Sequence, residues 1–203
     1  MDRPAFVFSH RTNNFATHQP VLYSAVQRSK GPVAEFGCGY GSTPLLHKFC
    51  AEQGRPVVTF ESNAEWIDKI RAEFASDTHW FIEVEDWETI VRHPIVQQTD
   101  WGLLFVDQAP FEARLWTVKA LGDLPAYFVI HDCDYFPEHG LFGTAHRKLA
   151  GPHDTGIRTY DDVFSSYKEF FPLPPWPYAP TGPPTLLASN HFDCDIDIDF
   201  LAF

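Results

Sequence analysis

The stretch VAEFGCGYGSTPLL (residues 33–46) joins a short apolar run to three glycines at alternate positions, Gly37, Gly39 and Gly41. Glycine adds no side-chain packing and loses more conformational entropy on folding than any other residue. The clustering of three glycines indicates that a ligand or another part of the chain approaches this backbone closely. Serine, threonine and proline follow directly and are typical of a helix N-terminus. The stretch therefore predicts a strand, a glycine-rich turn and the start of a helix, which together form a site for a ligand that contacts backbone.

Short apolar runs and longer amphipathic segments alternate along the rest of the chain, a pattern typical of a parallel sheet covered by helices. The predicted strands span 32–37, 55–62, 79–85, 101–108, 126–134, 183–190 and 194–203. The predicted helices span 42–53, 64–75, 87–93, 111–121 and 160–171, and a further helix within 19–29 precedes the first strand. The pattern predicts an α/β fold.

The composition narrows the choice of partners. The chain of 203 residues has a net charge of −12, and its 15 lysines and arginines form no long run. This charge disfavours nucleic acids and anionic membranes and suits a cationic or neutral small ligand. The four cysteines lie far apart without CxxC spacing, as expected of free thiols in a reducing compartment. With no apolar run long enough for a signal peptide or a membrane span, we expect a cytoplasmic protein.

Two classes of ligand compete for the glycine-rich turn. The dinucleotide fingerprint GxGxxG requires its third glycine at position 42, which is Ser42 here. The observed spacing is GxGxG, and Glu35 lies two residues before the first glycine. An acid at this place is a poor neighbour for a pyrophosphate and a good one for an ammonium or sulfonium group. The turn therefore favours a cofactor that carries a positive charge.

The segment VAEFGCGYGS resembles motif I of the class I S-adenosylmethionine-dependent methyltransferases, which is an acid, one residue and then Gly-x-Gly-x-Gly. The resemblance implies that Gly37, Gly39 and Gly41 approach the methionine part of S-adenosylmethionine. It also implies that Glu35 helps to hold the amino group of this cofactor. The resemblance extends over about residues 31–135.

Acids at the ends of the next two predicted strands extend the resemblance. Glu61 ends the second strand, and a carboxylate there can accept hydrogen bonds from both ribose hydroxyls. Asn63 or Trp66 is placed to flank the adenosine. In the resembling family an acid after the third strand reaches the adenine amino group and an adjacent side chain covers the ring. These positions correspond to Asp86 and Trp87 in the segment VEDWET.

Candidate catalytic residues follow the fourth and fifth predicted strands. Asp107 ends the fourth strand, and His131, Asp132 and Asp134 cluster after the fifth. One interpretation makes His131 a general base beside Asp107 and Asp132. A second places Mg²⁺ on Asp107, Asp132 and Asp134. Some methyltransferases of the resembling family bind metal there, but their Asp-Asn pair is Asp132-Cys133 here. A third interpretation is structural, with the acids capping the next turn.

The N-terminal segment lies outside every motif. We expect residues 1–30 to form a helical cap and residues 31–203 to form the methyltransferase-like domain. Asn14, His18 and Tyr23 are candidate contacts if this segment closes over the cofactor. A helix that only packs against the domain is the alternative.

Two C-terminal segments also stand apart. The proline-rich loop 171–184 is expected to form either a wall over the methyl acceptor or a rigid crossover. The tail 193–199 alternates aspartates with apolar residues and Cys194. It lacks the glycine and distal glutamate of a calcium loop, so we expect an edge strand with one charged face.

The resemblance implies a Rossmann-like, seven-stranded and mostly parallel sheet of order 3-2-1-4-5-7-6, with helices on both faces. It implies methyl transfer from S-adenosylmethionine to an oxygen, or a nitrogen, of a small molecule or peptide. The alternatives are a non-catalytic module that binds this cofactor and another nucleotide-cofactor enzyme on the same fold. The identity of the acceptor, the need for a metal and the oligomeric state are left open.

Overall fold

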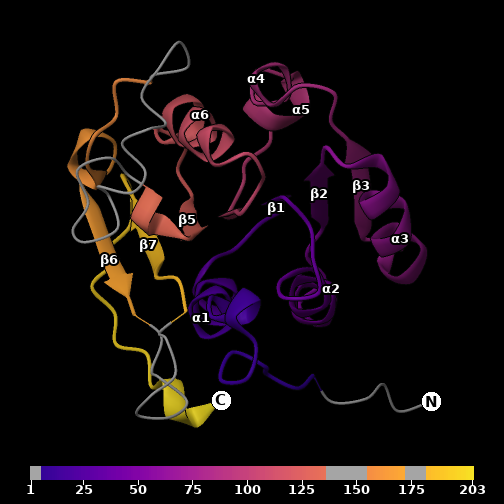
Figure 1. Ribbon diagram of the computed structural model, residues 1–203, viewed down its shortest axis with the longest axis horizontal. Coiled ribbons are helices and arrows are strands. Elements are labelled where there is room, and N and C mark those ends of the chain that lie inside the picture. Colours follow the sequence, from indigo (N-terminus) through magenta and orange to yellow (C-terminus); the bar gives the residue numbers. More distant parts are fainter. Residues whose placement is uncertain (1–5, 136–154, 172–181) are drawn as a thin grey trace.

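One sheet of seven strands organises the chain (Figure 1). The computed structural model describes residues 6–135, 155–171 and 182–203. The strand order is β3-β2-β1-β4-β5-β7-β6, which confirms the expected topology. The strands are β1 (Val33–Phe36), β2 (Val57–Glu61), β3 (His79–Glu83), β4 (Leu103–Val106), β5 (Tyr127–His131), β6 (Ser166–Phe170) and β7 (Thr185–Ser189). β1 to β5 run parallel, whereas β7 pairs antiparallel with both β5 and β6.

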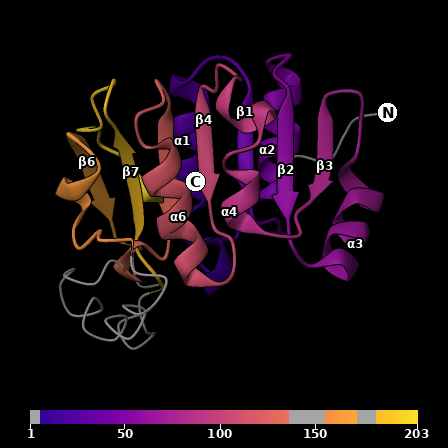
Figure 2. The same ribbon diagram turned by 90° about the horizontal axis from the view of Figure 1, so that it is seen from above.

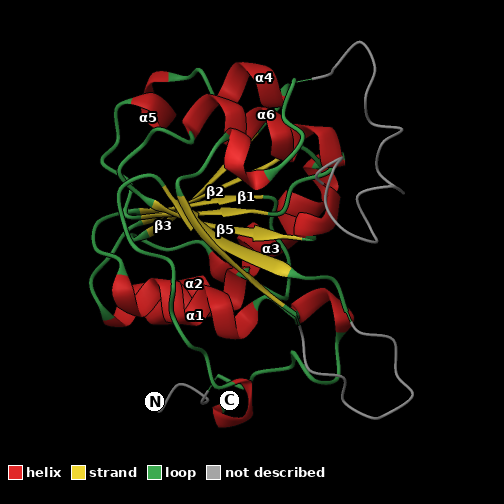
Figure 3. Cartoon of the chain, turned by 90° about the vertical axis from the view of Figure 1, so that its left-hand side faces the viewer, coloured by secondary structure: helices red, strands yellow, loops and turns green. Residues whose placement is uncertain are grey.

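Helices cover both faces of the sheet. They are α1 (Gln19–Arg28), α2 (Thr43–Glu52), α3 (Ala64–Phe74), α4 (Trp87–Ile90), α5 (Pro94–Gln97) and α6 (Phe111–Leu121). Figures 1 and 3 show α1 and α2 on one face and α4, α5 and α6 on the other. None of the helices in the described parts of the chain is long and apolar enough to cross a lipid bilayer.

The central strands β1 and β4 are buried along their whole length, because both faces of a parallel sheet are covered. Their side chains alternate between two apolar clusters. On the α4 and α6 side, Phe36 stacks on Phe60 with ring centroids 5.0 Å apart. On the α1 and α2 side, Val33 and Phe105 pack with residues of both helices. The apolar runs of the sequence thus form the middle layer of the fold.

Helix α1 is part of the second cluster. Val21, Leu22, Ala25 and Val26 are fully buried and pack with residues of α2 and the central strands. The helix therefore carries a continuous apolar stripe against the sheet, as an amphipathic surface helix does. The domain boundary at residue 30 stays a prediction.

The C-terminal part corrects two expectations. Residues 160–171 form no long helix; a 3₁₀ turn, Tyr160–Asp162, leads into β6. The tail 194–203 is irregular and ends in the 3₁₀ turn Phe200–Ala202, so the expected charged edge strand is wrong. β6 is the edge strand instead, and its pairing with β7 outweighs the weak helical pattern of its residues.

The sheet brings the ends of distant segments together. In Figure 2, the arrowheads of β2, β3 and β4 point to the same edge, and β1 and β5 run parallel to them. The chain leaves β1 toward β2 on one side, whereas β4 lies on the other side of β1. Such a reversal opens a crevice at the carboxyl ends of the two central strands, where α/β proteins bind ligands.

Candidate active site

A cavity of about 680 Å³ lies at this crevice. Three parts of the chain line it: the segment 13–18 before α1, the glycine loop 38–42 after β1, and the residues that follow β4 and β5. Arg114 of α6 closes one side. The volume is in the range typical of small-molecule and cofactor sites.

Two of the three glycines make room for other parts of the chain. Gly37 has a φ of +86°, and a Cβ at this position would lie 2.7 Å from backbone atoms of Asp107. A Cβ on Gly41 would lie 2.6 Å from the carbonyl oxygen of Phe15 and 3.0 Å from Cε1 of His18. Both contacts are shorter than real Cβ atoms tolerate or at that limit. These glycines therefore permit the close packing of β1 against β4 and of the N-terminal segment against the loop.

Gly39 faces open space. A Cβ there would meet no heavy atom of the described residues within 4 Å, and Gly39 lines the cavity. Cys38, Tyr40 and Trp66 line it beside Gly39. The indole Nε1 of Trp66 donates to the carbonyl oxygen of Cys38 at 2.8 Å, which fixes the ring against the loop. Gly39 is thus the glycine above which a ligand has room, although its own N–H donates to the hydroxyl of Thr43 at 3.0 Å and its carbonyl oxygen accepts from the N–H groups of Ser42 and Thr43.

Glu35 lies beneath the glycine loop and is fully buried. Its carboxylate accepts hydrogen bonds from the hydroxyls of Ser42 at 2.6 Å, Thr43 at 3.0 Å and Thr59 at 2.6 Å. Ser42 occupies the N-cap position of α2, but its hydroxyl serves Glu35 and caps nothing. Burial raises the pKa of Glu35 to about 7, although the three hydroxyls favour its charged form. Glu35 braces the loop from below, and its predicted contact with a cofactor stays a prediction.

Glu61 links the end of β2 to the same loop. One carboxylate oxygen accepts from the backbone N–H of Cys38 at 3.1 Å. The other oxygen accepts from the N–H groups of Ser62 at 2.7 Å and Asn63 at 2.9 Å. Asn63 in turn caps α3 by accepting from the N–H of Trp66. The predicted roles at ribose and adenosine remain predictions for both side chains.

Asp86 and Trp87 lie at the start of α4. Asp86 is exposed and caps this helix by accepting from the N–H and the hydroxyl of Thr89. Trp87 is buried, and its indole N–H donates to the carbonyl oxygen of Ala109 at 2.9 Å. Neither residue lines the cavity formed by the described residues. Their predicted adenine contacts therefore stay predictions.

Asp107 and His131 meet across the ends of β4 and β5. Nδ1 of His131 lies 3.2 Å from Oδ1 of Asp107, and Nε2 lies 3.1 Å from the hydroxyl of Thr17. Burial disfavours a charged His131, but the charge and hydrogen bond of Asp107 together with the charge of Asp132 outweigh it and raise the pKa of the imidazole. Burial also opposes ionisation of Asp107, but His131 and Arg114 hold the pKa of Asp107 at about 2. Each of the two side chains therefore favours the charged form of the other.

Arg114 joins the two strand ends and was not predicted. Its guanidinium bonds Oδ1 of Asp107 at 2.9 Å and Oδ2 of Asp132 at 2.8 Å, and it donates to the carbonyl oxygen of His131 at 2.7 Å. Asp132 has a φ of +49°, a left-handed conformation that costs energy for a residue with a Cβ. Arg114 thus holds a strained residue in place at the edge of the cavity.

The sequence contained one signal for Arg114. It is the single arginine on the predicted helix FEARLWTVKAL, which starts four residues after Asp107 and is otherwise mostly apolar on its inner face. A buried arginine normally has acidic partners. No comparable signal marked Thr17 or Gln19. The side-chain amide of Gln19 donates to the carbonyl oxygen of Gly41 at 2.9 Å.

His18 is the least explained residue of the site. It is 1% exposed, and its ring centroid lies 4.5 Å from that of His131 and 4.8 Å from that of Phe105. Neither ring nitrogen makes a well-aligned hydrogen bond within the described residues, although the backbone of Gly41 lies close enough to favour the charged imidazole. Burial lowers the pKa of His18 to about 3, and the charge of His131 adds to this effect. A neutral imidazole with unused polar atoms therefore borders the cavity.

The metal prediction receives no support from this geometry. Asp107, Asp132 and Asp134 all line the cavity. Within the described ranges, however, the group of side chains whose ligand atoms converge is a different one: His18, Asp107 and His131, with ligand atoms within 4.8 Å of one another. Imidazoles are poor ligands for Mg²⁺, which prefers oxygen.

The four cysteines are free thiols, as expected.

The remaining predicted contacts divide into two groups. Asn14 lines the cavity, as His18 does. Tyr23 points elsewhere, because its ring packs on Phe49 at 4.7 Å and on Phe8 at 5.6 Å.

Most of the proline-rich loop 171–184 lies outside the described residues. The tail bends along β6, where Asp195 binds Lys168 at 2.9 Å.

Comparison with known proteins places the fold. No protein-family model and no curated protein matches the sequence. An O-methyltransferase from Bacillus cereus in complex with SAH superimposes with a TM-score of 0.55 at 14% identity, over 85% of this chain and 80% of that chain. SAH-bound methyltransferase PaMTH1 from Podospora anserina gives 0.55 at 15% identity, over 84% of this chain and 77% of that chain.

A spermidine synthase in complex with the transition-state analogue AdoDATO is also similar. Its TM-score is 0.56 at 14% identity, and the match includes 91% of this chain but 62% of that chain. These likenesses show that the chain has the fold of S-adenosylmethionine-dependent methyltransferases and related enzymes. At such low identity, activity is argued from the site.

Proposed function

We propose that the protein transfers a methyl group from S-adenosylmethionine to an oxygen, or a nitrogen, of a small molecule or peptide. The observation that carries this proposal is the open cavity above Gly39, which the glycine loop 38–42 lines from one side and Asp107 and His131 line from the other. A cofactor along the loop would bring its reactive methyl group toward the two strand ends. The fold shared with SAH-bound methyltransferases supports this placement.

The charge around the loop suits a sulfonium cofactor. Glu61 contacts the loop directly, and Glu35 lies beneath it. Cys38 and Gly39 border the cavity with backbone, while Trp66 and Tyr40 offer aromatic rings to a flat base or a cation. We assign Glu61 to the ribose hydroxyls.

The other end of the cavity suits the acceptor. A sulfonium methyl is already electrophilic, so the protein must align a nucleophile and remove its proton. His131 is placed to take this proton once it is neutral, and Asp107 would stabilise the imidazolium that forms. Asp132 acts through Arg114, which orients Asp107. Oxygen is the preferred acceptor atom because imidazole is well matched to a hydroxyl proton.

Calorimetry with three ligands tests the cofactor. The proposal expects one-to-one binding of SAH and S-adenosylmethionine and no binding of NAD⁺. Binding of NAD⁺ in preference to SAH would instead support another nucleotide-cofactor enzyme.

A transfer assay separates an enzyme from a non-catalytic module. Radiolabelled S-adenosylmethionine is incubated with small-molecule and peptide fractions of a cell extract, with the wild type and with Asp107→Asn. Label in a product made by the wild type and lost in the variant supports catalysis. Tight cofactor binding without transfer to any fraction would favour a binding module. A cytoplasmic location stays a prediction.

A further inference from the structure

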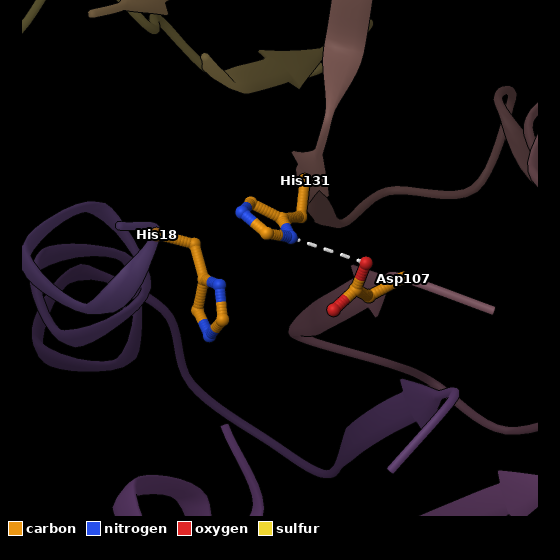
Figure 4. A group of neighbouring side chains, drawn as sticks. All are labelled: His18, Asp107 and His131. Atoms are coloured by element: carbon orange, nitrogen blue, oxygen red, sulfur yellow. Dashed lines mark hydrogen bonds and ion pairs between the residues drawn. The ribbon is translucent and has the colours of Figure 1, made fainter. Parts of the chain in front are cut away.

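His18, Asp107 and His131 come from three separate parts of the fold, and Figure 4 shows their side chains turned toward one another. His18 precedes α1, Asp107 follows β4 and His131 ends β5. Each offers one ligand atom, and these atoms lie within 4.8 Å of one another. We propose that these three residues bind a divalent transition-metal cation, of which Zn²⁺ is the best match.

The first argument is the state of His18. A buried polar group without a partner normally has an explanation such as an unobserved ion or ligand. The side chain of His18 is almost completely buried, and its ring nitrogens make no well-aligned hydrogen bond within the described residues even though the backbone of Gly41 lies nearby. Packing alone would select an apolar ring beside Phe105. An ion at the cavity would use the lone pair that this imidazole presents.

The second argument is the tautomer of His131. The hydroxyl of Thr17 lies 3.1 Å from the carbonyl oxygen of Pro183, to which it donates its one hydrogen. The same hydroxyl must therefore accept from Nε2 of His131 at 3.1 Å. With its hydrogen on Nε2, a neutral His131 turns the lone pair of Nδ1 toward the carboxylate of Asp107. Two facing lone pairs repel, so a cation belongs between them, either a proton or a metal ion.

The third argument is the support behind each ligand. Metal-binding histidines almost always donate their second N–H to a fixed acceptor, and metal-binding carboxylates are themselves hydrogen-bonded. Thr17 serves His131 in this way, and Arg114 serves Asp107 at 2.9 Å. Arg114 and Asp132 are themselves paired, so the arginine is not an uncompensated charge beside the ion. The set resembles a ligand shell with its outer partners in place.

The donor set selects the kind of ion. Two imidazoles and one carboxylate suit Zn²⁺ and other transition metals rather than Mg²⁺ or Ca²⁺. Zinc bonds of about 2.0–2.2 Å are compatible with the 3.2 Å between Nδ1 of His131 and Oδ1 of Asp107, and His18 supplies the third ligand atom of the group within 4.8 Å. Three protein ligands leave a further position on the ion, and the cavity borders it. A hydroxyl or water of a bound molecule can occupy that position.

The site has a consequence for methyl transfer that rests on the proposed function, whereas metal binding itself does not. With the ion bound, His131 is a ligand and no longer a base. The ion would hold the acceptor oxygen and lower the pKa of its hydroxyl. The hydroxyl proton would pass to water in the open cavity, the acceptor oxygen would form the new bond to the methyl carbon, and the sulfur would keep the electron pair of the broken bond as SAH leaves.

The experiment uses Co²⁺ as a spectroscopic substitute for Zn²⁺. Protein treated with a chelator and desalted is titrated with Co²⁺, and the visible absorption reports ligand geometry. The expected result is one equivalent bound with the intense bands of a four- or five-coordinate site, which Zn²⁺ then bleaches by displacement. Absence of stoichiometric binding by the wild type would overturn the proposal. This readout requires no cofactor, so it is independent of the methyl-transfer assays.

Two variants and a control locate the ion. His18→Ala removes the ligand, and His18→Phe removes it while keeping a ring beside Phe105. Both are expected to weaken Zn²⁺ binding by roughly tenfold or more, as calorimetry measures. His191→Ala removes an exposed imidazole near the opposite edge of the sheet and should bind as the wild type does. Wild-type affinity in either His18 variant, with its fold checked by circular dichroism, would contradict the assignment.

Discussion

Gly41 leaves the space that His18 fills: a Cβ on Gly41 would lie 3.0 Å from Cε1 of the His18 ring. The glycine loop is therefore shaped by the N-terminal segment as well as by a ligand. The side-chain amide of Gln19 strengthens the same contact by donating to the carbonyl oxygen of Gly41. The three glycines of the loop consequently have different tasks, which substitution can separate.

Gly41→Ala should destabilise the protein by about 1–3 kcal/mol, because the new methyl group meets the Phe15 carbonyl and the His18 ring. Gly39→Ala is the matched control, since a Cβ there meets no described atom. It should stay within about 0.5–1 kcal/mol of the wild type. Urea unfolding followed by circular dichroism measures both. Equal losses in the two variants would show that the close approach is not what Gly41 permits.

Arg114→Met should destabilise the protein by roughly 3–5 kcal/mol, because it removes the partner of Asp107 and Asp132 and leaves their charges in a partly buried place. Arg114→Lys keeps the charge but cannot bond both carboxylates in the same geometry. It should retain more stability than Arg114→Met and still lose most of the methyl-transfer activity. An active Arg114→Met protein would exclude a positioning role for this arginine.

Asp132 tests the left-handed backbone. Its φ of +49° costs about 1–2 kcal/mol for a residue with a Cβ but little for glycine. Asp132→Gly and Asp132→Ala both lose the ion pair with Arg114, so their difference isolates the backbone. We expect Asp132→Gly to be more stable by about 1 kcal/mol in chemical unfolding, after the greater entropy of unfolded glycine is included. If Asp132→Ala is as stable as Asp132→Gly, the conformation carries no strain.

Glu35 should make stability depend on pH. Burial raises the pKa of Glu35 from its ordinary value of 4.5 to about 7 in the folded protein. Between these values the folded state holds a proton that the unfolded state has lost. The contribution of this group is therefore complete below about pH 4.5, declines as the pH rises to 7, and stays low above it. The total change is about 3 kcal/mol.

Glu35→Gln isolates the contribution of Glu35 ionisation to the pH dependence of stability. The glutamine side chain is neutral at every pH and keeps a carbonyl oxygen that can accept from the hydroxyl donors. The free energy of unfolding is measured in urea between pH 4.5 and 8 for both proteins. The wild type should lose stability relative to the variant as the pH rises. Parallel curves would mean that Glu35 ionises normally despite its burial.

The main features of the fold follow from local patterns. Buried parallel strands read as apolar runs, and five of the predicted strands contain β1 to β5. β6 was missed because its sequence, SYKEF, is half polar and becomes a strand by pairing with β7. The tail was predicted as a strand from its alternation, yet Asp195 and Asp197 bind Lys168 and the backbone forms no ladder.

The candidate site was predictable where it depends on strand ends. Parallel neighbours place their carboxyl ends together, so the meeting of Asp107 and His131 follows from the strand order. Thr17 and Arg114 join them through packing between distant segments, which local sequence does not encode. The sequence motif identifies Glu35 as a candidate site residue. Its complete burial could not be predicted, because that burial depends on the pairing of β1 with β2 and on the hydroxyl of Thr59.

The central claim is that the open space beside Gly39 receives the cofactor. Calorimetric titration of SAH into the wild type and Gly39→Val tests it most directly, because a Cβ there meets no described atom within 4 Å and a branched side chain takes up space at the cavity that Gly39 leaves open. We predict one-to-one binding to the wild type and affinity about tenfold or more weaker in the variant, at least 1.4 kcal/mol. No binding to the wild type, or equal binding to both proteins, would contradict the claim.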